Sequence, residues 1–510
     1  MADEPRTSLD PGETAEIVLD QARAEYDDDL RGKTRRSVFW TIGRAASDQV
    51  FSFTIFVLLA RLLSKQDIGV FAMAYVFSEA GRIIATGGLT QLIARAPRVD
   101  SKLVDTIFWS NVGVAVVYVG MIWLTAPLIA ELVHQPTLER PLQVLSFALL
   151  LNSMGASHMA LRLRQFGHRT IAMRSVLSGL LGGGAAVLAA LSGLGVWSLV
   201  IQRLITELIG MVLSWTAYPW KPGRDFDWSQ VRYNLGFGGN LAIAQLIFLF
   251  LVRAQDLLIG AWLGAASVGI YRVAWRSAEI IGNGAIQPFA QVGLQTYSRL
   301  QSAPHALRNA YKAMLRNCSA LSLPALIGFG VMSPSIVPLV FGAKWSFSGG
   351  LGQIFALMAV PYTLNYFASP VLTAMGDTRR QRTLAMIQLG STLAFTWIAL
   401  PYGLTAVAAA YVLRSYLTMP FQIRFLKVAS SITFGDTIAA IRAPLIASTV
   451  MGAVVWTVLH LWRPAGHVGW PAVLTLVPLG AAVYAGVLLS ISAEHVTALR
   501  LFVRRRTAHA

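Results

Sequence analysis

Long apolar segments separated by short polar connections run along the chain from residue 37 to about residue 491. A helix needs about 20 apolar residues to cross the hydrocarbon core of a bilayer, and most of these segments have about that length. The pattern therefore predicts an all-α integral membrane protein with about fourteen transmembrane helices. We place them at residues 37–60, 68–93, 106–130, 141–161, 175–192, 196–218, 233–258, 268–292, 317–340, 348–375, 383–402, 404–421, 443–462 and 471–491.

The composition narrows the class of protein. Hydrophobic residues make up 55% of the 510 residues and charged residues only 13%, and the mean hydropathy is +0.56. An ordinary soluble domain carries about 25% charged residues. This balance excludes a set of soluble domains, a disordered chain and a disulfide scaffold, and the single Cys318 allows no intrachain disulfide.

The net charge of +17 would suggest a nucleic-acid partner in a soluble protein. In a membrane protein, Lys and Arg gather instead in the cytoplasmic connections. Thirty of the 42 Lys and Arg residues lie in one alternate set of connections and at the termini, five lie in the other set, and seven lie within spans. We therefore expect an even number of spans, both termini in the cytoplasm, and no nucleic-acid partner.

The first 36 residues differ from the rest of the chain. Residues 1–30 contain ten acidic residues, and residues 31–36 contain four basic ones. Segments of low hydrophobicity and high charge are typically disordered, and no apolar signal segment follows Met1. We expect residues 1–36 to form an acidic, disordered cytoplasmic tail.

An internal repeat divides the membrane region into two halves of six spans. An even number of spans in each half makes the repeat parallel, with its axis along the membrane normal. This predicts an N-lobe at residues 37–220, a C-lobe at 221–430, and a terminal pair of spans with a basic cytoplasmic tail at 431–510. The matches are Gly69/Gly269 and Glu79/Glu279 at an offset of 200, residues 169–173 and 382–386 at 213, and Arg203/Arg414 at 211.

Ionisable side chains inside the spans are the main candidates for function, because a charge within a membrane is costly. Most of them are spaced three or four residues apart, so each pair lies on one helix face. Local neutralisation inside the bundle is the alternative to a binding role. The pairs are Arg44–Asp48, Glu79–Arg82, Arg203–Glu207, Arg253–Asp256 and Arg276–Glu279.

Arg272 and Arg414 have no partner at this spacing, so seven arginines face five carboxylates within the spans. This excess of positive charge predicts an anionic ligand. The planar guanidinium group suits phosphate oxygens, and Arg272 and Arg276 lie one turn apart, within reach of one diphosphate.

Amide and aromatic side chains in the spans suit sugar binding, and hydrogen bonding between helices is the alternative. Asn283, Gln287, Tyr362 and Asn365 are the candidates. A Walker A motif and a His-rich metal motif are both missing from the sequence, and the connections predicted to be external are short. We therefore expect no metal, no cofactor and no enzymatic activity. The short external connections leave little room for the catalytic loop that an integral membrane polysaccharide polymerase would need, which argues against this alternative.

Three stretches resemble the polysaccharide transporter family of the multidrug/oligosaccharidyl-lipid/polysaccharide superfamily. They are FVLLARLLSKQDIGVFA at 56–72, DLLIGAWLG at 256–264 followed by VGIY at 268–271, and AMGD at 374–377. The resemblance implies fourteen helices in two six-helix lobes plus a terminal pair, with a central cavity formed largely by spans 1, 2, 7 and 8. It also implies a flippase that moves a polyprenyl-pyrophosphate-linked oligosaccharide by alternating access.

On this basis each group of candidates receives an expected role. Four arginines would hold the pyrophosphate, five residues would act as charge partners or in coupling to protons or sodium ions, and three more are secondary candidates. These are, in order, Arg44, Arg82, Arg272 and Arg276; Asp48, Glu79, Arg253, Asp256 and Glu279; and Arg203, Glu207 and Arg414.

The expected setting is the inner membrane of a bacterium, where the protein would act as a monomer. The expected partners are the lipid-linked oligosaccharide, membrane lipid and polysaccharide assembly proteins. A flippase for the peptidoglycan lipid precursor and a multidrug exporter of the same superfamily stay open as alternatives.

Overall fold

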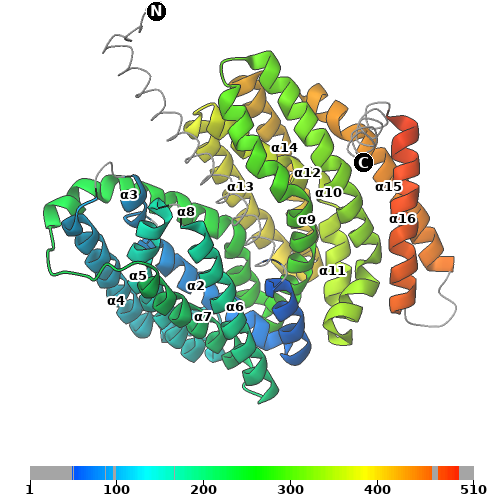
Figure 1. The fold of residues 1–510 in the computed structure, drawn as a ribbon. Helices are drawn as coiled ribbons and strands as arrows, with labels where there is room; N and C mark the ends of the chain where they lie inside the picture. The colour runs from blue at the N-terminus through cyan, green and yellow to red at the C-terminus, as the bar shows by residue number, and fades with distance from the viewer. Residues whose placement is uncertain are drawn as a thin grey trace, which may run out of the picture.

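The computed structural model describes residues 49, 51–86, 88–95, 99–165, 167–461 and 469–492, and these residues form helices joined by short connections (Figure 1). The expected acidic tail, Arg44 and Asp48 lie outside the described residues. The helices are Phe51–Leu62, α2 (Lys65–Thr86), α3 (Thr90–Arg95), α4 (Ser101–Leu132), α5 (Glu139–Arg164), α6 (His168–Leu191), α7 (Val196–Ala217), α8 (Trp228–Leu263), α9 (Ala265–Arg299), α10 (Pro304–Phe341), α11 (Ser346–Ala356), α12 (Ala359–Ala374), α13 (Thr378–Ala399), α14 (Leu404–Ser430), α15 (Phe434–Leu461) and α16 (Trp470–Ile491), with short 3-10 turns η1 (Pro136–Leu138), η2 (Ala343–Trp345) and η3 (Leu400–Tyr402).

The prediction of an all-α membrane protein is confirmed. Within the described residues, ten helices are long and apolar enough to cross a bilayer, and α11 with α12, bent by 61° at their junction, counts as an eleventh. The helix α9 falls below this apolarity because it carries Arg272, Arg276 and Glu279. The count of fourteen spans stays a prediction.

Several helices are longer than the predicted spans. The helix α10 has 38 residues, which corresponds to about 57 Å at 1.5 Å per residue, well beyond the hydrocarbon thickness of about 30 Å. Its first turns contain Arg308, Lys312 and Arg316, which we expected in a connection. A helix satisfies its own backbone hydrogen bonds, so it can continue beyond the end of the membrane span. In α10 this continuation places the three basic side chains outside the hydrocarbon region.

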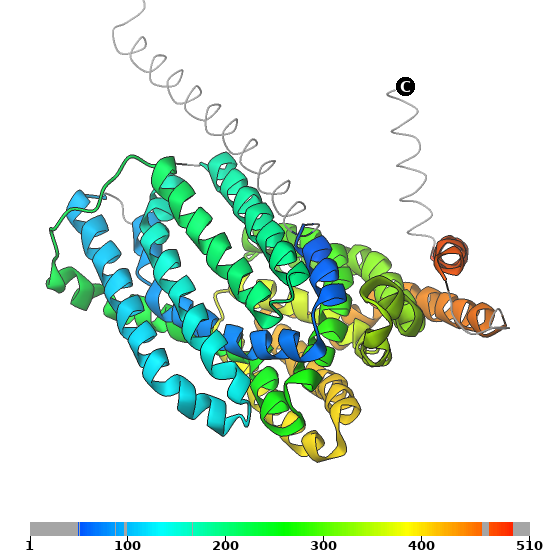
Figure 2. The ribbon, with the colours of Figure 1, turned by 90° about the horizontal axis from the view of Figure 1, so that it is seen from below.

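The helices form two groups (Figures 1 and 2). The N-terminal group consists of α2–α7 and the C-terminal group of α9–α14, with α8 packed against members of both. The helices α15 and α16 pack together on the outer side of α10. The exact division into lobes at residues 220 and 430 stays a prediction.

The two groups meet where α2 runs against α9, and two glycines allow the contact. A Cβ atom on Gly69 would lie 1.7 Å from the carbonyl oxygen of Ala265, and one on Gly269 would lie 2.0 Å from that of Lys65. Gly69 thus faces Ala265, and Gly269 faces Lys65. Lys65 and Ala265 are themselves 200 residues apart, as the two glycines are. This reciprocal contact has the two-fold relation that the predicted parallel repeat requires.

Side-chain hydrogen bonds close the same end of the molecule. Arg61 donates to two carbonyl oxygens near the end of α10, both at 2.7 Å. Lys344 donates to two carbonyl oxygens near the end of helix Phe51–Leu62, at 2.6 and 2.9 Å. The indole of Trp345 donates to the carbonyl oxygen of Ala60 at 2.8 Å. These bonds attach the start of the chain to the C-terminal group.

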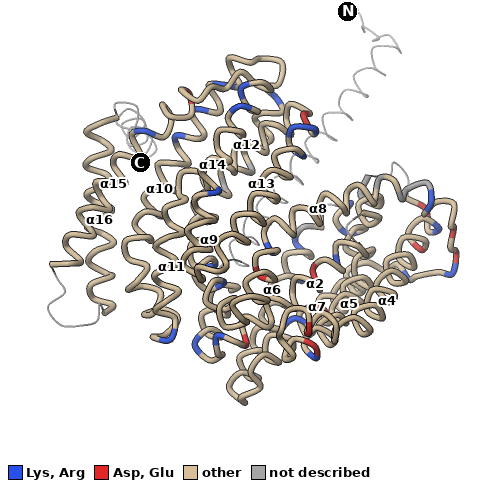
Figure 3. The backbone as a smooth tube through the Cα atoms, turned by 180° about the vertical axis from the view of Figure 1, so that it is seen from behind, with Lys and Arg blue, Asp and Glu red and all other residues tan. Residues whose placement is uncertain are grey.

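Lys and Arg also distinguish the two ends of the bundle (Figure 3). The connections α5–α6, α7–α8, α9–α10 and α12–α13 lie at the end opposite this closure, because consecutive long helices run in opposite directions. Basic residues are frequent in these connections and in the helix turns beside them, among them Arg164, Lys221, Arg299 and Arg379. This end is the one that the charge pattern predicts to face the cytoplasm.

Candidate functional site: a charged cavity between the helix groups

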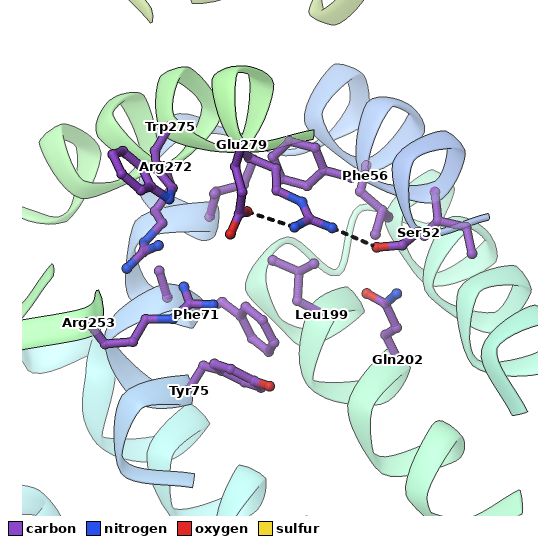
Figure 4. Close-up of a pocket in the computed structure, with 15 residues that line it drawn as sticks. Ser52, Phe56, Phe71, Tyr75, Leu199, Gln202, Arg253, Arg272, Trp275 and Glu279 are labelled. Carbon is purple, nitrogen blue, oxygen red and sulfur yellow. Dashed lines mark hydrogen bonds and ion pairs between the residues drawn. The ribbon is translucent and has the colours of Figure 1, made fainter. Parts of the chain in front are cut away.

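Three adjoining cavities meet at Tyr75, in the middle of α2. The first has a volume of about 310 Å³ and is lined by residues from helix Phe51–Leu62, α2, α7, α8 and α9 (Figure 4). The second, about 480 Å³, extends along α8 past Glu79 and Arg82. The third, about 410 Å³, extends toward α6 and α7 past Gln202 and Arg203. The predicted central cavity between the helix groups is therefore present.

Tyr75 lies between two cations. The guanidinium carbons of Arg203 and Arg253 lie 5.4 and 5.5 Å from the centre of its ring, which is the range of a cation–π contact. Its hydroxyl group donates to Glu79 at 3.3 Å. Tyr75 thus connects α7, α8 and α2 at the junction of the three cavities.

Arg276 joins α9 to the first helix. Its Nη1 lies 2.8 Å from Glu279, and its Nη2 donates to the hydroxyl of Ser52 at 3.1 Å, as the dashed lines in Figure 4 show. The side chain of Arg276 is 30% exposed. Part of its guanidinium group is therefore available to a ligand in the cavity.

Two more of the predicted pairs form in the N-terminal group. Arg82 donates through Nε to Glu79 at 3.0 Å, and its side chain is 35% exposed. Arg203 lies 2.7 Å from Glu207, which also accepts a hydrogen bond from the amide of Asn152 at 2.9 Å. Each pair lies on one helix face, as the spacing predicts.

The expectation that Arg272 lacks a partner is wrong. Arg272 on α9 makes a two-pronged ion pair with Asp256 on α8, with Nε 2.7 Å from Oδ1. Arg253, the expected partner of Asp256, lies 3.9 Å from it. The carboxylate is fully buried, and the arginine on the neighbouring helix reaches it with better geometry than the one on its own helix. Arg253 is therefore the arginine with the weaker pairing.

The described part of this cavity carries a net positive charge. Five arginines line the three cavities (Arg82, Arg203, Arg253, Arg272 and Arg276), and two carboxylates line them as well (Glu79 and Glu279). Two further carboxylates, Glu207 and Asp256, pair with these arginines from buried positions beside the cavities. An excess positive charge in a poorly solvated site favours an anionic ligand.

Three of the four candidates for sugar contacts, Asn283, Tyr362 and Asn365, hydrogen-bond to other side chains. The carbonyl oxygen of Asn283 accepts from the hydroxyl groups of Tyr362 and Tyr366, at 3.0 and 2.5 Å. Asn365 accepts from two glutamine side chains, and Gln287 is exposed on α9. Arg414 lies apart from the central cavity, beside Tyr411.

Ser52, Tyr75, Gln202 and Trp275 are among the cavity residues that were not candidates. A signal existed for two of them, since Tyr75 and Trp275 match at the offset of 200 and each lies one turn before a matched glutamate. Within the described residues, His, Cys, Asp and Glu form no group of three or more that is placed to hold a metal ion.

The fold and this cavity define a multi-pass membrane protein of transporter type. The chain belongs to the family described as "Polysaccharide biosynthesis protein", whose profile matches residues 58–348.

Two relatives are similar over much of their length. The "Succinoglycan biosynthesis transport protein ExoT" of Rhizobium meliloti (strain 1021) is 23% identical over 459 residues, 84% of this chain and 92% of the relative. The "Lipopolysaccharide biosynthesis protein WzxC" of Escherichia coli (strain K12) is 23% identical over 348 residues, 67% of this chain and 69% of the relative.

Two solved structures share the fold. A structure described as "Lipid II flippase MurJ, inward closed conformation" superposes with a TM-score of 0.70 at 12% identity, covering 88% of this chain and 98% of that one. An inward-facing multidrug resistance MATE family transporter gives a TM-score of 0.60 at 14% identity, covering 79% and 95%.

Proposed function

We propose that this protein is a flippase that moves a polyprenyl-pyrophosphate-linked oligosaccharide across the inner membrane of a bacterium by alternating access. The single observation that carries the proposal is the cavity between the helix groups, which is lined by five arginines and two glutamates, with two more carboxylates buried beside it. The names of the two relatives, which refer to succinoglycan transport and lipopolysaccharide biosynthesis, support a polysaccharide precursor as the cargo.

The pyrophosphate would bind where guanidinium groups are partly exposed. Arg276 and Arg82, with side chains 30% and 35% exposed, keep donors free to face the cavity beyond their pairs with glutamate. Arg253, loosely paired with Asp256, adds a third. Arg272 would act mainly by holding Asp256, and the expected contribution of Arg44 lies outside the described residues. Charge-assisted hydrogen bonds from arginine to phosphate are among the stronger protein contacts.

The conformation fits one step of alternating access. The helix groups are joined at the end that contains Arg61, Gly69 and Lys344, which the charge pattern predicts to face outward. The cavities lie further along α2 toward the opposite end, past Tyr75 to Arg82. The protein would then load its cargo from the cytoplasmic side, with both termini in the cytoplasm.

The carboxylates of the cavity suit coupling to an ion gradient. Glu79 and Glu279, at matching positions of the repeat, would exchange their arginine partners for a proton or a sodium ion as the cargo leaves. Asp256 stays paired with Arg272 in this scheme. We propose no catalytic role, a monomeric state, and polysaccharide assembly proteins as the partners that supply and use the cargo.

The experiment replaces Arg276 with alanine and measures lipid-linked oligosaccharide on the outer leaflet of spheroplasts. We expect R276A to lower the rate about 10- to 100-fold, the factor that corresponds to about 1.5–3 kcal/mol for a hydrogen bond to a charged group. The matched control is R308A. Arg308 on α10 pairs with Asp436 on α15 at 2.7 Å, and this pair lies away from the cavity.

Equal rates for R276A, R308A and the unaltered protein would refute the anion site. Deleting the gene distinguishes the cargo: loss of a surface polysaccharide supports the proposal. Loss of peptidoglycan precursor export would favour the alternative flippase. The positive cavity argues against a multidrug exporter for cationic compounds.

A further inference from the structure

A further, smaller cavity lies within the C-terminal group, among α12, α13 and α14. Its volume is about 50 Å³, and its lining includes Asn365, Gln388, Arg414, Thr418 and Gln422. Asn365 is exposed, so the cavity is accessible from outside the helix group. The residues that line it differ from those of the three central cavities.

Arg414 is buried in this cavity without a counter-charge. Its residue exposure is 5%, and its Nε has no hydrogen-bond partner. The guanidinium carbon lies 4.4 Å from the centre of the Tyr411 ring, and in the described part of the chain no carboxylate reaches ion-pair distance. A buried charge normally has a partner, because its desolvation costs several kcal/mol.

The N-terminal group shows how the matching arginine is satisfied. Arg203, which matches Arg414 at an offset of 211, lies 2.7 Å from Glu207. The amide nitrogen of Asn152 on α5 donates to the same carboxylate at 2.9 Å. An arginine and an asparagine amide thus converge on one anionic group.

The C-terminal group retains two of these three side chains. Counted along the sequence, Thr418 corresponds to Glu207 at the offset of 211, and Asn365 corresponds to Asn152 at the offset of 213. Thr418 is 4% exposed, and its hydroxyl donates to the carbonyl oxygen of Ser415. The cation and the amide remain, and only the carboxylate is missing.

The amide of Asn365 is oriented with its oxygen toward two donors. That oxygen accepts from Gln388 at 3.0 Å and from Gln422 at 2.7 Å. The NH₂ group of Asn365 donates to none of the described residues, so it is available as a donor beside Arg414. Two kinds of hydrogen-bond donor line a space that contains no acidic side chain.

We propose that this cavity binds a small monovalent anion of halide size, in the position that the carboxylate of Glu207 has in the N-terminal group. The guanidinium group of Arg414 and the amide NH₂ of Asn365 would hold it. A space of about 50 Å³ exceeds the roughly 10–15 Å³ that one water needs, but it is too small for a sugar diphosphate. This site is independent of the proposed transport cycle.

The test measures thermal unfolding of the purified full-length protein in sodium chloride and in sodium gluconate at equal ionic strength. For the unaltered protein, we expect chloride to raise the midpoint saturably, by a few °C. T418E supplies the missing carboxylate, so it should raise the midpoint without chloride and remove most of the chloride response. R414Q should remove the response by removing the cation.

The reciprocal variant E207T is the matched control. It removes the carboxylate from the N-terminal group, so its chloride response should exceed that of the unaltered protein. A chloride response as large in T418E as in the unaltered protein would overturn the proposal, because it would come from other arginines.

A direct measurement keeps the proposal testable if these variants do not fold. Crystals of the unaltered protein soaked in bromide should show anomalous density between Arg414 and Asn365. Absence of bromide there, at a concentration that saturates the thermal response, would equally overturn the proposal.

Discussion

Arg272 and Asp256 show how an ion pair inside a membrane protein can position other groups without being exposed itself. Asp256 is fully buried and Arg272 is 8% exposed, and the pair joins α8 to α9 beside the central cavity. Removing one member of a buried pair leaves the other charge uncompensated, which costs about 3–5 kcal/mol. The pair is therefore expected to matter more for stability than for binding the cargo.

D256N should lower the free energy of unfolding by about 3–5 kcal/mol, and D256N/R272M should recover much of the loss, because Arg272 then no longer leaves a buried charge without its partner. Thermal or denaturant unfolding in detergent measures both. D377N is the control, since Asp377 pairs with Arg380 near the surface and asparagine caps a helix as well as aspartate does. Equal losses in D256N and D377N would contradict a special role for the buried pair.

At the scale of elements, the crossing of α2 and α9 decides how closely the two helix groups approach. Gly69 and Gly269 each face a carbonyl oxygen of the other helix at a distance that excludes any side chain. Small residues allow helices in membranes to pack with their backbones in contact. The contact lies next to the hydrogen bonds of Arg61 and Lys344, so it belongs to the closed end of the cavity.

G69A and G269A should each destabilise this closed end, at a cost of about 1–3 kcal/mol for overpacking. We expect lower midpoints of thermal unfolding and greater accessibility of the cavity from the predicted external side. G113A is the matched control, because a Cβ atom there meets nothing within 4 Å, and alanine favours the helix by up to about 1 kcal/mol. If G69A and G269A behave like G113A, the glycine contact is not what holds this end together.

At the scale of the whole molecule, the distribution of Lys and Arg makes a testable statement about orientation. The connection between α7 and α8 contains Lys221 and Arg224, whereas η3, between α13 and α14, contains no basic residue. The positive-inside rule therefore assigns the first to the cytoplasm and the second to the outside. The two connections lie at opposite ends of the bundle.

Cysteine labelling tests this assignment in a C318A background, since Cys318 is the single native cysteine and is buried. We expect Y402C to react with a membrane-impermeant maleimide in intact spheroplasts, because Tyr402 is 78% exposed in η3. K221C should react only after permeabilisation. The opposite result would invert the orientation, and with it the direction in which the cavity opens.

The sequence alone determined the features that depend on periodicity and on one helix at a time. Apolar segments of membrane-spanning length predicted the all-α membrane fold, and three-to-four-residue spacing predicted pairs such as Glu79–Arg82 and Arg276–Glu279, because both properties are local. The offset of 200 residues also marked Gly69 and Gly269 as equivalent positions.

Only the tertiary structure decided which charges remain available. Asp256 pairs with Arg272 rather than with Arg253 because a neighbouring helix presents the better geometry, which spacing along one helix does not encode. Packing likewise brought Tyr75 between two arginines and enclosed Arg414 in a cavity without a carboxylate. The charge excess is a property of the sequence, but its location follows from contacts between helices.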